Sequence, residues 1–253
     1  MCNFMGYKIS VEQFILLMEI EKQFGTAAAI YELERMKDGF KYGNSAVLRK
    51  SAPNDFEIVS MHWEFIPPWI RDMEELKTAR KQGIPWLNAT SEKLLESKMF
   101  RNAALKRRCL VLATHFFDWR HYKPEGASKD IAYPYVVQRK DEERFFMAGI
   151  WQTWTDKSTG ETMDTFAIVT TRGNSLMSQV HNKKNRMPTI LTDELAWEWM
   201  MNDDLSEDRI KEIASFQLPA KLIKAHSIRK DFKLIDDPME PCVYAELPQL
   251  SEL

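Results

Sequence analysis

The sequence predicts an α+β protein with a mixed, largely antiparallel, barrel-like sheet that is flanked by helices. Many short apolar segments are rich in the β-branched and aromatic residues typical of strands. Helical segments lie between them, without the regular strand–helix alternation that builds a parallel sheet. The 253 residues are near the upper size for one hydrophobic core, so we expect a single domain over 2–253. We expect its acidic last part, 202–253, to add helix and strand elements that pack on the rest.

Capping residues delimit the predicted helices. Ser10 and Gln13 have the spacing of a capping box, and the apolar run that follows them ends at Gly25. Thr26 is placed to cap a second helix, over 26–39. The other predicted helices span 69–83, about 193–201 and about 206–214.

The predicted strands are short apolar runs bounded by turn residues. The first of them stops at Pro67 and Pro68, because proline has no N–H to donate to a sheet. The predicted strands span 56–66, 86–89, 108–113, 116–122, 133–139, 144–151 and 165–171.

Composition and motifs exclude several classes of protein. No run of 18 apolar residues exists, so we expect no transmembrane helix and no membrane partner. The first residues lack the pattern of a secretory signal, and the three cysteines are few and widely spaced, which favours the cytoplasm. No GxGxxG, P-loop, HExxH or Cys/His metal spacing occurs, so we expect no metal and no cofactor.

Basic charge is concentrated locally, although the net charge is only −2. Residues 71–108 contain ten Lys/Arg and five Asp/Glu, and 172–188 contain four Lys/Arg and no acid. Residues 189–253 contain fourteen acids and seven bases. A polyanion needs only a local positive groove, and such a groove is one interpretation of the two basic segments. Solvated helix faces are the other.

Cys2 directly follows the initiator methionine. If Met1 is removed, the chain begins with an amine and a thiol on adjacent carbons, with ordinary pKa values of about 7.7–8.0 and 8.5. The amine can add to an aldehyde to give a Schiff base, and the thiol can then close a five-membered thiazolidine. Alternatively, the thiol attacks an acyl carbon with the amine as its base.

Three other polar residues are singled out. Asn88 in WLNATSEK follows a short apolar strand, Asp118 in CLVLATHFFDWRHY lies between aromatic residues, and His181 in QVHNKKNRMPTIL lies in the acid-free basic segment. Together with Cys2, these segments resemble the SRAP (SOS-response-associated peptidase) family of abasic-site-processing proteins. The motifs follow in the family's order and spacing from Cys2 to about Met201. They are Met-Cys at 1–2, WEFIPPW at 63–69, NATSE at 88–92, SKMF at 97–100, RRCLVLATHFFDW at 107–119 and HNKKNRMP at 181–188.

The resemblance implies a protein that binds single-stranded DNA and forms a thiazolidine crosslink with the aldehyde of an abasic site. Cys2 would be the nucleophile of this crosslinking enzyme. Asn88 would hydrogen-bond the sugar or the terminal amine, and Asp118 would accept a proton near that amine. His181 would be the acid/base for sugar-ring opening and for crosslink reversal, with help typically worth about 10²–10⁴-fold. Self-processing of the N-terminus and a part in the SOS response are further implications, and no obligate protein partner is implied.

The resemblance also implies a DNA-binding groove. Its candidate phosphate contacts are Lys98, Arg101 and Arg186, and Trp69 and Met99 are candidates to stack on bases or to wedge between them. Thr90 also lies in the groove, at a place where family members often have arginine.

This sequence departs from the family pattern at several positions. Phe4 and Thr90 stand where arginines are frequent, and Asp118 replaces a glutamate. A displacement of a catalytic group by about one methylene can cost about 10²-fold in rate. His115 is close to Asp118 in sequence and is an alternative acid/base.

Two other functions stay open at the level of sequence. An N-terminal-nucleophile amidohydrolase also begins with Met-Cys, but the Asn3-Phe4 step does not match the class II glutamine amidotransferases. A diverged single-strand-binding protein would keep the fold and bind DNA without crosslinking it.

Overall fold

The computed structural model describes residues 2–7, 36–83 and 85–251. The helix predicted over 10–25, and the helix expected to begin at Thr26 as far as residue 35, lie outside these residues. The predicted end of that second helix is wrong, because Lys37–Asp38 form strand β2 and Gly39–Lys41 form a 3-10 turn.

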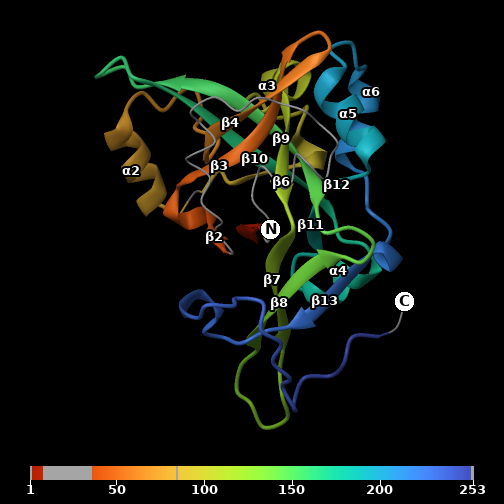
Figure 1. The fold of residues 1–253 in the computed structure, drawn as a ribbon. Coiled ribbons are helices and arrows are strands. Elements are labelled where there is room, and N and C mark those ends of the chain that lie inside the picture. The colour runs from red at the N-terminus through yellow and green to blue at the C-terminus, as the bar shows by residue number, and fades with distance from the viewer. Residues whose placement is uncertain (1, 8–35, 84, 252–253) are drawn as a thin grey trace.

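Five strands close into a barrel in the centre of the molecule (Figure 1). They are β3 (Asn44–Ala52), β4 (Asp55–Trp63), β6 (Arg108–Ala113), β9 (Phe145–Thr155) and β10 (Thr162–Arg172). Their order is β10-β4-β3-β6-β9, and β9 pairs with β10 to close the ring. Only the β4–β10 pair in this ring is parallel, which confirms the predicted barrel-like and largely antiparallel sheet. Three short strands extend it: β5 (Asn88–Thr90), β11 (Arg186–Pro188) and β12 (Ile190–Leu191).

A second, five-stranded sheet lies at one end of the barrel. Its order is β13 (Ile223–Ser227), β8 (Ile131–Arg139), β7 (His115–Tyr122), β1 (Phe4–Gly6) and β2, and every pair is antiparallel. Only Thr114 separates β6 of the barrel from β7 of this sheet. The chain therefore runs directly from a strand of the barrel into the sheet that contains the N-terminal strand β1.

Helices flank the barrel and the second sheet (Figure 1). They are α2 (Met73–Lys81), α3 (Arg101–Lys106), α4 (Ser175–Val180), α5 (Asp193–Met201) and α6 (Glu207–Ala214). Short 3-10 turns span Ser91–Lys93, Ala220–Leu222 and Phe232–Leu234. In the part of the chain that the structure describes, no helix has the length and apolarity needed to cross a membrane.

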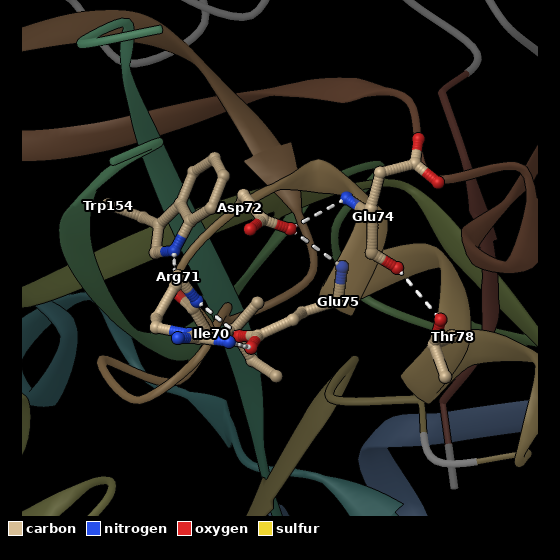
Figure 2. A network of polar contacts seen from close by, with 7 residues as sticks. All are labelled: Ile70, Arg71, Asp72, Glu74, Glu75, Thr78 and Trp154. Carbon is tan, nitrogen blue, oxygen red and sulfur yellow. Dashed lines mark hydrogen bonds and ion pairs between the residues drawn. The ribbon is translucent and has the colours of Figure 1, made fainter. Parts of the chain in front are cut away.

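Helix α2 begins four residues later than predicted. The Asp72 carboxylate accepts hydrogen bonds from the backbone N–H groups of Glu74 and Glu75, which makes Asp72 the N-cap (Figure 2). The segment before it is held to the barrel, because the Trp154 indole donates to the Ile70 carbonyl at 2.7 Å (Figure 2).

The core has two layers, one on each face of the barrel wall. Apolar residues of α3, α5 and α6 pack on the outside of the wall. The inside is filled by inward-facing side chains, which alternate along the strands with outward-facing ones. Val47, Val111, Met147 and Phe166 are among the inward-facing residues. The Trp199 indole of α5 donates to the carbonyls of Cys109 and Gly149 and so joins the helix to the wall.

Gly149 leaves room for a sulfur atom in the barrel. A Cβ atom at this position would lie 2.8 Å from Cys109 Sγ and 3.1 Å from Val111 Cγ2. Overpacking of this kind costs about 1–3 kcal/mol, so we expect Gly149→Ala to lower the free energy of unfolding by that amount. Chemical denaturation measures the effect. Cys109→Ala/Gly149→Ala should recover part of the loss, and a purely additive double variant would contradict the packing argument.

Candidate functional site

Cys2 lies at the end of the barrel, two residues before the start of β1. Its side chain is fully buried and belongs to the same apolar cluster as the barrel interior. Burial raises the pKa of its thiol to about 12, and the nearby charge of Asp118 adds to the rise. The sulfur is therefore a neutral thiol at pH 7, and a reaction at this sulfur requires a neighbouring group that takes its proton.

Asp118 projects from the middle of β7, at the position paired with Tyr135 of β8. One of its carboxylate oxygens, Oδ1, accepts the backbone N–H of Trp119 at 2.9 Å. Burial raises its pKa from the ordinary 3.8 to about 6, and the positive charge of Lys184 opposes that rise. At neutral pH the group is an ionised carboxylate, but its basicity is well above that of an exposed aspartate.

His181 ends helix α4 and brings its ring to Asp118. Its Nδ1 atom lies 3.2 Å from Asp118 Oδ2 and 3.0 Å from the carbonyl oxygen of Arg186. A carbonyl can only accept, so Nδ1 bears the proton and Nε2 is left as the acceptor of a neutral ring. Burial lowers the pKa of His181 to about 4, and the charge of Lys184 lowers it further.

Local structure fixes the place of His181. The Asn174 side chain caps α4 by accepting from the N–H groups of Leu176 and Met177. The chain then turns at Asn185, which has a left-handed φ of 47°, and its N–H donates to the His181 carbonyl at 2.8 Å. The turn delivers Arg186 to β11, which pairs with β10 of the barrel. The imidazole is therefore held from both sides.

Asn88 opens β5, next to Ile168 of β10. Its Nδ2 donates to Asn3 Oδ1 at 2.9 Å. Its own Oδ1 is buried and has no hydrogen-bond partner among the residues that the structure describes. A buried unpaired acceptor is costly unless a ligand supplies a donor, so this oxygen is a candidate contact for a substrate hydroxyl or amine.

The contact between Asn3 and Asn88 was missed by the sequence analysis. No spacing rule predicts that an amide beside Cys2 meets an amide 85 positions later. The backbone of Asn3 is fixed as well, because its carbonyl accepts the Gly39 N–H at 2.9 Å. Lys184 was also not singled out, although it is exposed and its charge acts on both Asp118 and His181.

The predicted phosphate contacts differ in the ion pairs and hydrogen bonds that they already form within the protein. Lys98 is exposed and has no ion pair among the described residues. Arg101 is ion-paired with Glu207, and it also donates to the Leu95 carbonyl at 2.9 Å. These two cations therefore differ in how readily they can reach a phosphate.

Arg186 and Thr90 lie on strands β11 and β5, which both pair with β10. Arg186 pairs with Glu92 at 2.5 Å and donates to the carbonyl of Thr170. Thr90 is half-buried and lies beside Thr170 in the β5–β10 pair. A phosphate contact by Arg186 would compete with its bond to Glu92.

The two predicted platform residues lie in different environments. Trp69 is 56% exposed, in the segment before α2. Met99 is only 9% exposed and packs in the outer core cluster, which leaves little of its side chain for a base. Their roles stay predictions, but Trp69 has the exposure that stacking needs and Met99 does not.

Two further residues that the sequence singled out lie in apolar surroundings. Phe4 is buried against Trp119 and Phe232, with the Lys233 ammonium 3.9 Å from its ring. His115 is fully buried, and its Nδ1 lies 2.9 Å from Thr114 Oγ1. It is three positions from Asp118 on one strand, so the two side chains point to opposite faces of the sheet. The geometry favours His181 over His115 as the partner of Asp118.

The sequence of this chain is similar to a known protein family and to several of its members. The family model described as SOS response associated peptidase (SRAP) matches residues 13–233. The abasic site processing protein YoqW of Bacillus subtilis is 31% identical over 153 residues, which are 60% of this chain and 61% of YoqW. The abasic site processing protein YedK of Escherichia coli is 24% identical over 188 residues, which are 74% of this chain and 75% of YedK.

Two solved structures are similar to this chain. A crystal structure of a protein from Bacteroides thetaiotaomicron superposes with a TM-score of 0.81 at 30% identity, over 96% of this chain and all of that one. A second crystal structure, of a Bordetella bronchiseptica protein, has a TM-score of 0.69 at 21% identity and shares the fold.

Proposed function

Because the chain belongs to the SOS response associated peptidase family, we propose that it processes abasic sites in DNA by covalent capture through Cys2. The observation that carries the proposal is the buried pair of Asp118 and His181, 3.2 Å apart, whose carboxylate acts electrostatically on the Cys2 thiol. The names of the relatives point to the same class of substrate.

The proposed reaction needs the free amine of Cys2, and therefore removal of Met1. The amine adds to the aldehyde carbon of the ring-opened sugar, and the carbinolamine loses one water to give a Schiff base. The Cys2 sulfur then forms a bond to the same carbon, its proton passes by way of Asp118 to the former imine nitrogen, and the thiazolidine ring closes. The net change is aldehyde plus aminothiol to thiazolidine plus water, so no oxidant or cofactor is needed.

The neighbouring side chains are assigned roles in this reaction. The Asp118 carboxylate takes a proton from the Cys2 ammonium and later from the thiol, which burial has made weakly acidic. Neutral His181 presents Nε2 to the sugar as a proton acceptor for ring opening, and the same ring returns a proton when the crosslink reverses. Asn88 Oδ1 accepts a hydrogen bond from the sugar or from the amine.

We further propose that the DNA is single-stranded, because the abasic sugar would have to turn out of a double helix to reach a buried sulfur. Lys184 and Lys98 are exposed cations that can meet its phosphates, and Trp69 can stack on a base. Family membership also motivates the expectations of self-processing at the N-terminus and of a part in the SOS response.

The experiment that tests the proposal compares two single-stranded oligonucleotides on a denaturing gel. One has a single abasic site, and the other has the same site reduced by borohydride so that no aldehyde remains. We expect an SDS-stable band with the aldehyde only, in protein whose intact mass lacks Met1. Equal native binding of both strands without a stable band would instead indicate a single-strand-binding protein that does not crosslink.

A second prediction concerns Asn3, which we propose positions the Asn88 amide. Without its acceptor, the carboxamide of Asn88 can flip and present an NH₂ group where an oxygen is needed. We expect Asn3→Ala to slow crosslinking about threefold to tenfold, the worth of one neutral hydrogen bond. The rate at saturating DNA, measured on gels, should fall while the dissociation constant stays unchanged.

Asn3→Asp is the matched control, because it keeps an acceptor for Asn88 Nδ2 and should restore most of the rate. A loss of the same size in Asn3→Ala and Asn3→Asp would show that the amide contact does not matter.

A further inference from the structure

A cavity of about 290 Å³ lies at the other end of strand β6 from the site around Cys2. Strand β6 begins at Arg108, which lines this cavity, and ends at Ala113, where the chain passes into the sheet that contains Asp118. The cavity is bounded by the tip of the β3–β4 hairpin and by the last residues of α3 and α5. A β-bulge between Lys50 and Ala52 shapes its rim.

The lining is strongly basic. Four cationic residues line the cavity, namely Lys50, Lys106, Arg107 and Arg108, against a single carboxylate, that of Asp203. Such a lining in a concave site favours an anionic ligand.

Two of the four cations serve the fold. Arg108 donates to the carbonyls of Ala104, Leu105 and Trp199, and so ties the ends of α3 and α5 together. Lys50 donates to the Met201 carbonyl at 2.9 Å and is ion-paired with Asp203. Their charges contribute to the potential in the cavity, but most of their donors already bind acceptors of the protein.

The other two cations have donors without a partner among the residues that the structure describes. Arg107 Nε donates to the Trp151 carbonyl at 3.2 Å, which orients the guanidinium. Within the described ranges, neither terminal nitrogen of Arg107 has a hydrogen-bond or ion-pair partner, and the same is true of the exposed Lys106 ammonium. An oriented guanidinium with two free nitrogens matches the geometry of a phosphate, and a neighbouring ammonium adds a third donor.

An aromatic wall completes the cavity. The half-buried Trp151 lines it, and Arg49 lies over the Trp151 ring at 4.7 Å. Arg49 is itself fixed by ion pairs with Glu57 and Asp164, so the indole is held in place. A rigid aromatic beside free phosphate donors is a combination that recognises a sugar phosphate with an attached base.

We propose that this cavity is a second anion site, which binds a nucleotide phosphate through Arg107 and Lys106, apart from the site around Cys2. The shared chemistry has two possible sources. One is a phosphate of the DNA strand outside the lesion, and the other is a free nucleotide. The inference does not rest on the proposed crosslinking, because unmodified nucleic acid suffices to test it.

The test uses unmodified oligothymidylates of about 5 and about 20 nucleotides, together with thymidine 5′-monophosphate, as probes. Binding to wild type, Lys106→Gln/Arg107→Gln and the control Lys129→Gln/Lys221→Gln is measured by calorimetry over a range of salt. The control removes the same two charges from exposed positions outside the cavity. Lys106→Gln alone removes an exposed ammonium that has no partner among the described residues, and Arg107→Lys keeps the charge. These two variants remain informative if the double variant folds poorly.

If the phosphate belongs to the DNA strand, the cavity variant should bind the long oligonucleotide about tenfold more weakly than wild type. The slope of the logarithm of the binding constant against the logarithm of the salt concentration should be smaller by about 1.4. Binding of the short oligonucleotide should be unchanged. If a free nucleotide is the source, wild type and the control should bind the monophosphate and the cavity variant should not. Indistinguishable binding of all three probes by the cavity variant and the control would overturn the proposal.

Discussion

Cys2→Ala is expected to abolish the SDS-stable crosslink to an abasic oligonucleotide while leaving a transient Schiff base. Alanine at position 2 still presents a free amine once Met1 is removed, so the first bond to the aldehyde carbon can form. It has no sulfur to close the ring, and the imine hydrolyses. The gel should therefore show a band for this variant only when borohydride is added to reduce the imine, whereas wild type gives a band without it.

Cys242→Ser is the matched control for this experiment. Cys242 is a half-buried free cysteine near the C-terminus, and its backbone rather than its sulfur is bonded to Ser227. This variant should crosslink like wild type. A stable band from Cys2→Ala without borohydride would show that another nucleophile captures the lesion, and the thiazolidine mechanism would then be wrong.

The parts of the fold that the sequence predicted are those fixed by local rules. Strand β6 and helix α5 have the predicted bounds, since each is an apolar segment with a clear start. The Thr192 hydroxyl caps α5, as its place before the first helical residue would suggest. By contrast, β3 was not predicted, because NSAVLRKSA mixes small and charged residues. It is a strand because β4 and β6 flank it, and such long-range pairing leaves no local mark.

The site was predictable as a set of residues but not as an arrangement. Motif resemblance singled out Asp118 and His181, and the structure places their side chains in contact. The roles assigned to them are still predictions. The carbonyl of Arg186, which fixes the His181 tautomer, and the amide of Asn3, which holds Asn88, have no sequence signature, because backbone carbonyls and amides pair with any suitable partner. Met99 shows the opposite case, since an apolar side chain in a motif serves the core or a ligand equally well.

Asp118→Asn is expected to slow crosslinking about 10²–10⁴-fold, the usual worth of a general base, and to change the pH profile. The wild-type rate should rise through about pH 6, where the carboxylate of Asp118 ionises. We assign this rise to Asp118 rather than to His181, because burial lowers the pKa of His181 to about 4. A second rise near pH 8 is expected as the Cys2 amine loses its proton. The asparagine variant should keep only this second rise, as measured by single-turnover rates between pH 5 and 9.

The same substitution separates the role of Asp118 in chemistry from its effect on stability. The pKa of Asp118 is raised from 3.8 to about 6 in the folded protein, so the ionised carboxylate opposes folding. The protonated carboxyl therefore makes its full contribution to stability below pH 3.8, and this contribution is lost as pH rises through 6. Asp118→Asn should therefore increase the free energy of unfolding at pH 8, by up to about 3 kcal/mol, and by less at pH 5. A variant that is slower and yet more stable at pH 8 indicates that the buried charge is kept for reactivity. A variant that loses rate and stability together at that pH would instead assign Asp118 to holding the fold around His181.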